Sequence, residues 1–271
     1  MTWLVSHQVD EFVDVAGDFL RSRPAEHTVL LTVLDSIRAR GIAARFGWWV
    51  SPSGVAGAFL QTPPEPVVLT GMPPEAVAPL VEILSDVDGL NVDGLNVERS
   101  LVDAVTALWP RPLQVRQRFR LHRLGSLTPP LPGPPGRARI AGPADRELLI
   151  SWYGQFLAEV GYSEDDLAGA VDYRIGYGGL TVWEVDGVPV SMASRTQPAA
   201  GMLRVGPVYT PVALRQRGYA GAVTAAVSRA AQELVDEVLL FTDLANPTSN
   251  ALYQRIGYRP VHDRVLLALT W

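Results

Sequence analysis

Two periods of hydrophobic residues alternate along the first half of the chain and predict a mixture of helices and strands. Apolar residues recur at helical spacing over 9–20, 28–40, 74–84 and 99–109. Alternating or short apolar runs bounded by turn residues predict strands over 45–50, 55–60, 66–70 and 114–124. We therefore expect a mixed α/β first half.

The second half shows the same alternation of periods. Helical spacing predicts helices over 144–160, 219–234 and 249–256. Asp186-Gly187 predicts a tight turn within a hairpin over 179–194, and further strands are expected over 202–210, 237–244 and 263–271. A strand–helix–strand unit places two parallel strands in one sheet through a right-handed crossover. The fold class expected is α/β, an α+β mixed sheet with helices on both faces.

A proline-rich stretch, LGSLTPPLPGPPG, separates the two halves. Its prolines disfavour regular helix or sheet and favour a stiff, extended spacer. A length of 271 residues also suits two domains. We expect a first domain over 1–123, a linker over 124–136 and a second domain over 137–271.

Composition excludes several classes of function. The net charge of −5 argues against a nucleic-acid or membrane-surface partner. There are no cysteines, and the four histidines form no i,i+4 pair, so we expect no metal site. No signal peptide or membrane-spanning run is evident, which favours a cytoplasmic protein. The sequence leaves the oligomeric state unknown.

The stretch LRQRGYAGAV lies where a predicted strand passes into a predicted helix. The first turn of a helix has unpaired N–H groups and carries the positive end of the helix dipole. Gly218 and Ala220 lack bulk, so an anion can approach the main chain, and Arg215 and Arg217 add positive charge. This pattern predicts a pyrophosphate site.

The strand before this stretch contains Gly206-Pro207. Proline cannot donate to a β-ladder, and a glycine within a strand often marks a bulge or the close approach of a ligand. We expect the sheet to open after this point. The amides of Val208 and Thr210 would then be free to pair with an extended, amide-bearing molecule such as pantetheine.

Two motifs in this half resemble a known family. Arg215-x-x-Gly218-x-Ala220 is similar to the (Q/R)-x-x-G-x-(G/A) signature of the GNAT N-acetyltransferases, which use acetyl-CoA. A downstream stretch, NPTSNALYQRIGYRPV, resembles the second signature of the family and matches it at Asn246, Leu252, Tyr253, Gly257 and Tyr258. The resemblance implies a tandem GNAT fold, strong over 137–271 and degenerate over 1–123.

The resemblance also implies an activity: direct acetyl transfer from acetyl-CoA to a small-molecule or peptide amine, without a metal. It implies a cofactor-binding set of Val208, Tyr209, Thr210, Arg215, Gln216, Arg217, Gly218, Tyr219, Ala220, Gly221 and Asn246. Tyr253 would be the general acid that protonates the leaving thiolate, although a core-packing role is the alternative. Glu184 is the first candidate for the general base and Asp243 the second, and either is alternatively a solvated strand-end carboxylate.

The first half lacks the Arg-x-x-Gly-x-Ala motif. Glu75 stands at the corresponding helix start, where its charge would repel phosphate, so one cofactor site per chain is expected. Two other classes stay open. A non-catalytic acyl-CoA-binding or regulatory protein is one, and a Rossmann-type enzyme is the other, although Gly218-x-x-Gly221 does not supply its glycine motif.

The acceptor side of the second half is rich in acidic residues. The resemblance places the acceptor wall near Glu159, Glu164, Asp165, Asp166 and Asp172. One hypothesis is that these carboxylates steer a cationic amine. The alternative is a helix start, where acidic residues favour the positive end of the helix.

Overall fold

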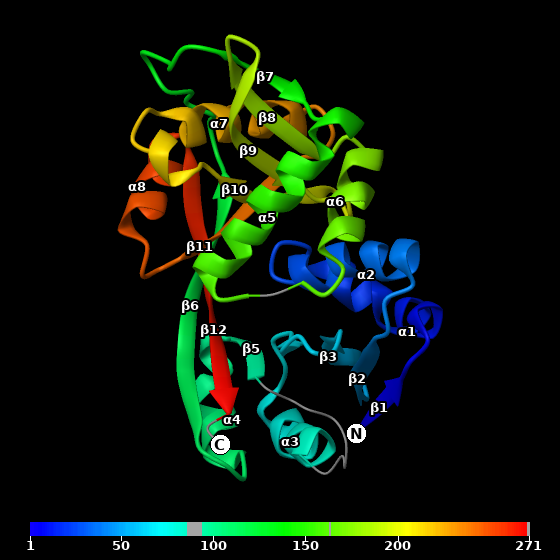
Figure 1. The fold of residues 1–271 in the computed structure, drawn as a ribbon. Helices are drawn as coiled ribbons and strands as arrows, with labels where there is room; N and C mark the ends of the chain where they lie inside the picture. Colours follow the sequence, from blue (N-terminus) through cyan, green and yellow to red (C-terminus); the bar gives the residue numbers. More distant parts are fainter. Residues whose placement is uncertain (86–93, 163, 270–271) are drawn as a thin grey trace. The chain divides into compact units, whose positions relative to one another are not determined.

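The chain forms two compact units in a computed structural model that describes residues 1–85, 94–162 and 164–269 (Figure 1). Unit 1 comprises residues 1–121, 242–246 and 261–271, and unit 2 comprises residues 122–241 and 247–260. Residues 261–271 belong to unit 1 although the helices of unit 2 precede them in the chain. Each unit is built around a mixed sheet.

Unit 1 has the strand order β1-β2-β3-β4-β5-β12-β6. Its strands are β1 (Thr2–Ser6), β2 (Arg45–Ser51), β3 (Gly54–Gln61), β4 (Val67–Leu69), β5 (Gly94–Glu98), β6 (Leu113–Leu124) and β12 (Tyr258–Leu269). Its helices are α1 (Val9–Ser22), α2 (Thr28–Arg40), α3 (Val77–Ser85) and α4 (Val102–Leu108), with 3₁₀ turns η1 (Pro74–Ala76) and η2 (Arg99–Leu101). β4 and β5 pair in parallel, and β12 pairs antiparallel with β5.

Alternation along the strands of unit 1 creates an apolar layer on each face of the sheet. Trp49 and Phe59 pack with Leu80 of α3 and Val105 of α4. Their neighbours Trp48 and Leu60 belong to a second cluster that contains the apolar residues of α1 and α2. Because successive side chains of a strand point to opposite faces, one strand serves both layers.

Unit 2 has the strand order β6-β11-β10-β9-β8-β7, so β6 contributes to both units. The other strands are β7 (Arg137–Ile140), β8 (Leu180–Val185), β9 (Val188–Arg195), β10 (Met202–Tyr209) and β11 (Glu237–Asp243). The helices are α5 (Arg146–Val160), α6 (Leu167–Gly176), α7 (Tyr219–Gln232) and α8 (Pro247–Arg255), with 3₁₀ turns η3 (Pro143–Asp145) and η4 (Val212–Leu214). β10 and β11 are parallel, whereas β7–β8, β8–β9 and β9–β10 are antiparallel.

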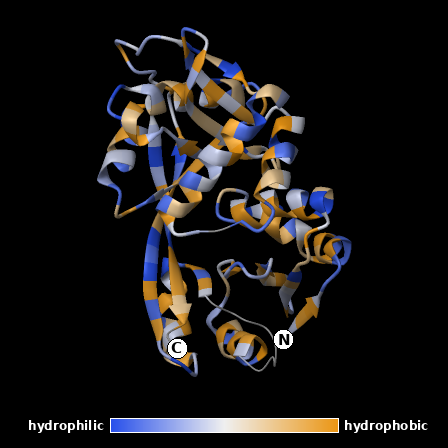
Figure 2. Ribbon diagram, viewed as in Figure 1, coloured by the Kyte–Doolittle hydropathy of each residue, from blue (hydrophilic) through white to orange (hydrophobic). Residues whose placement is uncertain are grey.

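The sheet of unit 2 also has helices on both faces. Leu203 and Val205 of β10 pack with Val223 and Val227 of α7, in a cluster completed by residues of α8. The opposite face holds Met192 and Tyr209 together with the apolar residues of α5 and α6. Figure 2 shows apolar residues along the strands and on the helix faces turned to them.

The observed architecture confirms the predicted α/β class with a mixed sheet and helices on both faces. The predicted helix over 28–40 is α2 to the residue. The pattern did not indicate β1, β5 or β7, which have only four or five residues. Such short strands offer too few residues for a period to emerge. No helix among the described residues is long and apolar enough to cross a membrane.

A buried arginine anchors β12 in unit 1. Arg264 is 1% exposed, and its guanidinium donates to the carbonyls of Leu69 and Asn96 and to the Asn96 side chain at 2.7–2.8 Å. It therefore joins β12 to β5 and to the end of β4.

We predict that Arg264→Met lowers the free energy of unfolding by about 3 kcal/mol, because buried carbonyl acceptors lose their donor. Chemical denaturation measures this loss. The matched control is Arg259→Met, at an exposed arginine of β12. Equal stability losses in the two variants would contradict this role of Arg264.

Candidate active site

The N-terminus of α7 is an open set of backbone donors. Gly218 is its N-cap with φ of 82°, and no side chain caps the helix. The first helical bond runs from the Ala222 amide to the Gly218 carbonyl at 3.1 Å. The amides before Ala222 have no partner within the helix and lie at its positive end. This end of α7 can therefore hold an anion.

The turn before α7 has a conformation that exposes main-chain amides. Gln216 has φ of 63°, and Gly218 is also left-handed. A side chain at a left-handed position costs roughly 1–2 kcal/mol, and glycine avoids this cost. A Cβ added to Gly218 would find the Pro134 ring at 3.7 Å, an ordinary contact, so the conformation of the turn rather than space selects glycine.

The two predicted phosphate arginines differ in their surroundings. Arg215 Nη2 lies 2.6 Å from a Glu159 carboxylate oxygen, and Nε donates to the Thr210 carbonyl at 2.9 Å. Its guanidinium also lies 5.7 Å from the centre of the Tyr209 ring. Arg217 is exposed and donates only weakly, to the Ala213 carbonyl at 3.3 Å. The Arg217 guanidinium is therefore more available than that of Arg215 to a ligand at the start of α7, because no carboxylate pairs with it among the described residues.

The parallel pair of strands beside this turn opens as the sequence predicts. The β10–β11 register runs from Met202–Glu237 to Val205–Leu240 and ends there, within the described residues. Gly206 has φ of 133°, and the register with β9 shifts between Val205 and Val208. Pro207 has no N–H to continue the ladder. The last part of β10 is therefore paired with β9 and not with β11.

The end of β10 is fixed from the β9 side. The Ser191 hydroxyl donates to the Tyr209 carbonyl at 3.0 Å and lies 2.8 Å from the Thr210 hydroxyl. The Tyr209 hydroxyl donates to Gln155 of α5 at 2.7 Å. These contacts hold the segment that leads into the α7 turn. The pairing of Val208 and Thr210 with pantetheine remains a prediction.

The structure brings the two signature motifs together. A Cβ on Gly221, in the first turn of α7, would lie 3.0 Å from Leu252 of α8. Only a residue without a side chain allows this approach of the two helices. Gly257, with φ of 112°, meets the Ser126 carbonyl, so a side chain there would collide with main chain. Gly221 and Gly257 thus have a packing reason, whereas the left-handed conformation selects Gly218.

Tyr253 lies on α8 against the apolar cluster of α7. Its ring is edge-on to Tyr258, with centroids 6.2 Å apart, and the Tyr258 hydroxyl pairs with Ser228 at 2.7 Å. The Tyr253 hydroxyl has no hydrogen-bond partner in the part of the chain that is described. Burial raises the pKa of Tyr253 to about 12, so the phenol keeps its proton at neutral pH.

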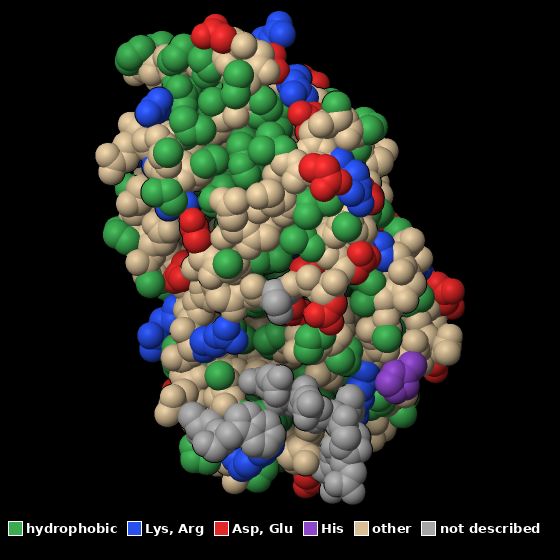
Figure 3. Space-filling view, in the orientation of Figure 1, with side chains coloured by type: hydrophobic (Ala, Val, Ile, Leu, Met, Phe, Trp, Pro, Cys, Tyr) green, Lys and Arg blue, Asp and Glu red, His purple; other side chains and the backbone are tan. Residues whose placement is uncertain are grey.

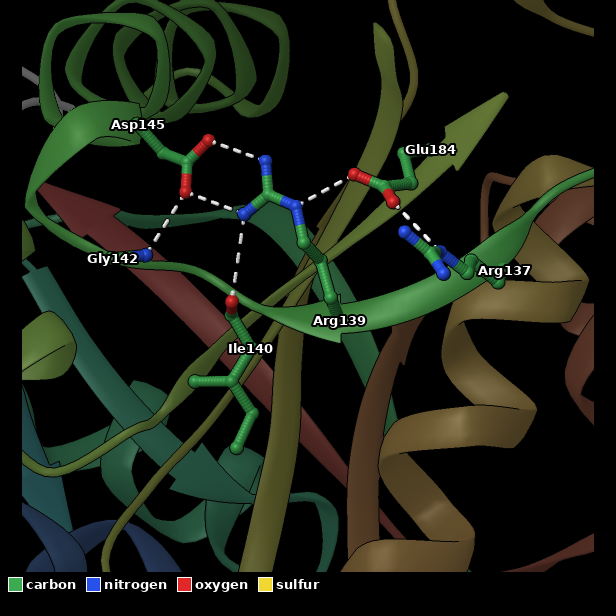
Figure 4. A network of polar contacts seen from close by, with 6 residues as sticks. All are labelled: Arg137, Arg139, Ile140, Gly142, Asp145 and Glu184. Carbon is green, nitrogen blue, oxygen red and sulfur yellow. Dashed lines mark hydrogen bonds and ion pairs between the residues drawn. The ribbon is translucent and has the colours of Figure 1, made fainter. Parts of the chain in front are cut away.

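Glu184 forms an ion-pair network at the edge of the sheet (Figure 4). Its carboxylate accepts from Arg139 Nε at 2.7 Å and from Arg137 Nε at 2.8 Å, and Arg139 also binds Asp145 at 2.7 Å. Hydrogen bonds from Arg139 and then Arg137 lower the pKa of Glu184. Glu184 belongs to β8, which β9 separates from β10 in the strand order.

The other predicted polar residues lie in the short segment before α8. Asp243 accepts from the Gln117 side chain and from the Ala245 amide, both at 2.8 Å. The Asn246 amide donates to the Asp243 carbonyl at 3.0 Å, and Asn246 directly precedes α8. Asp243 is thus tied into unit 1, which also contains Gln117.

The acidic residues near the predicted acceptor wall are largely engaged. Glu159 is paired with Arg215, and Asp172 is paired with Arg146 at 2.7 Å. Asp166 is the N-cap of α6 and accepts from the Gly169 amide at 2.9 Å. On the face drawn in Figure 3, acidic and basic side chains lie interspersed. Asp166 therefore fits the helix-start interpretation, and the ion pairs of Glu159 and Asp172 reduce the charge that could steer a cationic acceptor.

The proline-rich segment runs along unit 2. The Gly125 and Thr128 amides donate to the carbonyls of Gly257 and Ile256, at 3.0 and 2.9 Å. Further along, Pro130 lies 3.3 Å from a Cβ built on Gly221, and Pro134 lies 3.7 Å from one built on Gly218. The sequence shows why this segment is extended, but its packing against α7 was not predictable from composition.

The corresponding place in unit 1 is already filled by an acidic side chain. Glu98 accepts from the Gly71 amide at 2.9 Å, just after β4, the strand whose parallel partner is β5. The following turn η1 begins at Pro74, which has no N–H to offer. A phosphate would have to compete with the unit's own carboxylate. Among the described residues, no three His, Asp or Glu side chains gather as a metal site.

Several known proteins are similar to this chain in sequence or in fold. The family model described as "FR47-like protein" matches residues 191–266. A GNAT-family acetyltransferase from Colwellia psychrerythraea superposes with a TM-score of 0.65 over 100% of both chains, at 12% identity. A GCN5-related N-acetyltransferase from Kribbella flavida gives 0.63 over 89% of this chain and 96% of its own, at 19% identity.

A tandem arrangement is represented too. A tandem GNAT protein from the clavulanic acid biosynthesis pathway gives a TM-score of 0.61 over 98% of this chain and 97% of its own, at 12% identity. The chain has the tandem GNAT fold. This likeness confirms the fold that the two motifs predicted. A search of curated protein sequences gave no match.

Glu184 of β8 is paired with Arg137 and Arg139 of the edge strand β7, so we expect the stability of the fold to depend on pH. The pKa of Glu184 is lowered on folding, so its stabilising contribution is present above the ordinary value of 4.5 and is lost as the pH falls through the lower folded value. Glu184→Gln removes this contribution. We expect the variant to melt below wild type at pH 7, with the gap closing below pH 4.5. Thermal melts across this range measure the gap, and a gap that stays constant would refute the linkage.

Proposed function

We propose that the chain is an acetyl-CoA-dependent N-acetyltransferase whose co-substrate binds in unit 2. The observation that carries this proposal is the uncapped N-terminus of α7 beside a strand pair that opens at Val205. The first feature suits a pyrophosphate, and the second suits an extended amide-bearing arm. Few other ligands combine both groups.

In this proposal the main chain provides most of the binding. The backbone from Arg215 to Gly221 wraps the pyrophosphate, with charge from Arg217. The backbones of Val208, Tyr209 and Thr210 pair with pantetheine, and Asn246 contacts its arm. Arg215 acts indirectly in part, because its ion pair with Glu159 holds the turn.

The reaction is a direct transfer. The neutral amine attacks the thioester carbonyl, the carbon–nitrogen bond forms, and the carbon–sulfur bond breaks to release the thiolate. Tyr253 then supplies its phenolic proton to the sulfur. The phenol is protonated at neutral pH, as this role requires, while burial raises its pKa to about 12 and so makes it a weaker acid. The amine loses a proton to a base, and the hydroxyl of Tyr253 is returned to its neutral form from solvent.

Glu184 is the candidate base from the sequence. Its surroundings in the structure make it a weak base. Two guanidinium groups keep it ionised, which leaves an acceptor site but lowers its proton affinity. The Glu184→Gln variant separates the two roles. A base is indicated if kcat falls with folding intact at pH 7, and a role in joining β7 to β8 is indicated if only the melting temperature falls.

A specific observation also favours a second candidate, a non-catalytic acyl-CoA-binding protein. In unit 1, Glu98 already occupies the Gly71 amide, so one half of this chain has a GNAT-like unit without an open phosphate site. The retention of Tyr253 in unit 2 favours catalysis there. Release of free thiol from acetyl-CoA with a broad panel of amines distinguishes turnover from binding alone.

We predict that Tyr253→Phe lowers kcat about 100-fold, since positioned acids contribute roughly 10²–10⁴-fold to rate. The Kd for acetyl-CoA should stay within about twofold, because the ring is retained. Steady-state kinetics and calorimetry measure the two quantities. The control is Tyr258→Phe, whose hydroxyl binds Ser228. An unchanged kcat in Tyr253→Phe would exclude the phenol as the acid.

We further predict that one molecule of acetyl-CoA binds per chain. The free α7 terminus provides a site in unit 2, whereas Glu98 blocks the equivalent place in unit 1. Calorimetric titration gives the stoichiometry directly. Binding of two acetyl-CoA molecules per chain with comparable affinity would contradict the prediction that unit 1 has no cofactor site.

A further inference from the structure

A cationic cluster lies on the α5/α6 face of the sheet in unit 2. Leu203 and Val205 of β10 point into the α7 cluster, so Arg204 between them points to the other face. Arg204 Nη1 is buried and has no hydrogen-bond partner. Its guanidinium lies 5.8 Å from the centre of the Phe241 ring. A buried guanidinium N–H without an acceptor is costly, so an anion that accepted from it would be stabilised at this position.

Two further arginines lie near this part of the sheet: Arg174, whose charge acts on Arg204, and Arg195, the register partner of Val205 on β9. Arg174 of α6 lies 5.1 Å from the ring centre of Tyr153, and Arg195 of β9 lies 5.6 Å from that of Tyr177. Both arginines donate one Nη1 hydrogen bond to a backbone carbonyl, of Ala170 at 2.8 Å and of Thr196 at 3.2 Å. Neither of these bonds neutralises the charge.

No carboxylate of the described residues pairs with Arg174, Arg195 or Arg204. Burial is the largest cause that lowers the pKa of Arg204, to about 10, and the charge of Arg174 lowers it further. Arg204 therefore remains a cation at neutral pH. These arginines differ from Arg139 on the edge strand β7, which has both Asp145 and Glu184 as partners.

The surroundings of the cluster provide planar, partly accessible groups. Arg174, Arg195 and Arg204 are each partly exposed, so part of each side chain meets solvent although Arg204 Nη1 itself is buried. The Tyr177 hydroxyl donates to the Arg195 carbonyl at 2.7 Å, which fixes one side of it. Arg204 lies one residue before Val205, where the β10–β11 pairing ends. The cluster is therefore next to the opening in which the proposed thioester would lie.

We propose that Arg204, together with Arg174, binds a carboxylate of the substrate. That the bound molecule is a substrate rests on the proposed function. The anion site itself rests on the cluster alone. A carboxylate suits the fork of a guanidinium and is small and planar. The carboxylate belongs to the amine acceptor in the first instance, since α7 and the proposed pyrophosphate site lie on the other face of the sheet.

Direct binding is tested by thermal melts with succinate against succinamide and glycine against glycinamide, at matched ionic strength. The carboxylates should raise the melting temperature of wild type, and the amides should not. Arg204→Met keeps the aliphatic stem but removes the charge, and we expect at least a tenfold weaker carboxylate response. Arg174→Gln is a second variant in case the first fails to fold. Arg229→Met, an exposed arginine of α7, is the matched control.

Kinetics separate the two sources of the carboxylate. Amino acids and their amides are compared as acceptors with acetyl-CoA, and acetyl-CoA is compared with succinyl-CoA as donor. Arg204→Met should raise KM at least tenfold for the carboxylate-bearing partner, whichever it is, and leave KM for acetyl-CoA unchanged. A preference on the donor side would place the carboxylate on the acyl group.

Identical carboxylate responses in wild type, Arg204→Met and Arg174→Gln would overturn the proposal. The absence of any carboxylate response in wild type would do so too, and a response to inorganic phosphate alone would overturn the assignment to a carboxylate. Failure of the proposed function has a different signature, because acetyl-CoA would then not bind wild type in calorimetry while the melts with succinate and glycine still report on the cluster.

Discussion

The uncapped first turn of α7 is the feature on which the account of unit 2 depends. Gly218 provides a left-handed N-cap without a side chain, and the amides that follow have no acceptor within the helix. Two neighbouring features preserve this state. Gly221 admits Leu252 of α8 at close range, and the ion pair between Arg215 and Glu159 holds the chain that enters the turn. The donors are thus fixed before a ligand arrives, which reduces the ordering cost of binding.

The same architecture in unit 1 shows what happens when such donors are satisfied internally. There the Gly71 amide binds Glu98, and Pro74 replaces a donor at the start of the next turn. The two units share a parallel strand pair followed by a helix, but in unit 1 a carboxylate accepts from the Gly71 amide beside that helix, whereas no side chain caps α7. In the proposed account, Glu98 is the feature of unit 1 that competes with a phosphate, and the fold class is the same in both units.

Much of this fold was accessible from the sequence because its cause is local. The period of apolar residues identified α2 and α7, and the small residues Gly218 and Ala220 marked the turn into α7. The Gly206-Pro207 pair indicated where β10 leaves β11, and the register ends one residue earlier. Each of these inferences needs only the residue and its neighbours in the chain.

Features that depend on partners distant in sequence were not predictable. Nothing in the stretch around Arg215 indicates that Glu159 neutralises it, and Glu184 gives no sign of Arg137 and Arg139 as partners. The sequence did contain one signal for Arg204, which is a charged residue at an alternating position within an apolar strand. That pattern marks a residue turned to the opposite face of the sheet, and only the structure shows that Arg204 Nη1 has no hydrogen-bond partner among the described residues.

The most direct test of the central claim compares Gly218→Asp with Gly218→Asn in calorimetric titrations with CoA. Asn and Asp tolerate a left-handed φ better than other residues that have side chains, and Pro134 leaves room for the Cβ, so the two variants differ only in charge. A carboxylate at the N-cap competes with phosphate for the same amides. We predict that the Asp variant binds CoA about 10- to 100-fold more weakly than the Asn variant, a difference of roughly 1.4–2.8 kcal/mol, with equal affinity for pantetheine, which has no phosphate. Equal CoA affinities in the two variants would contradict the account.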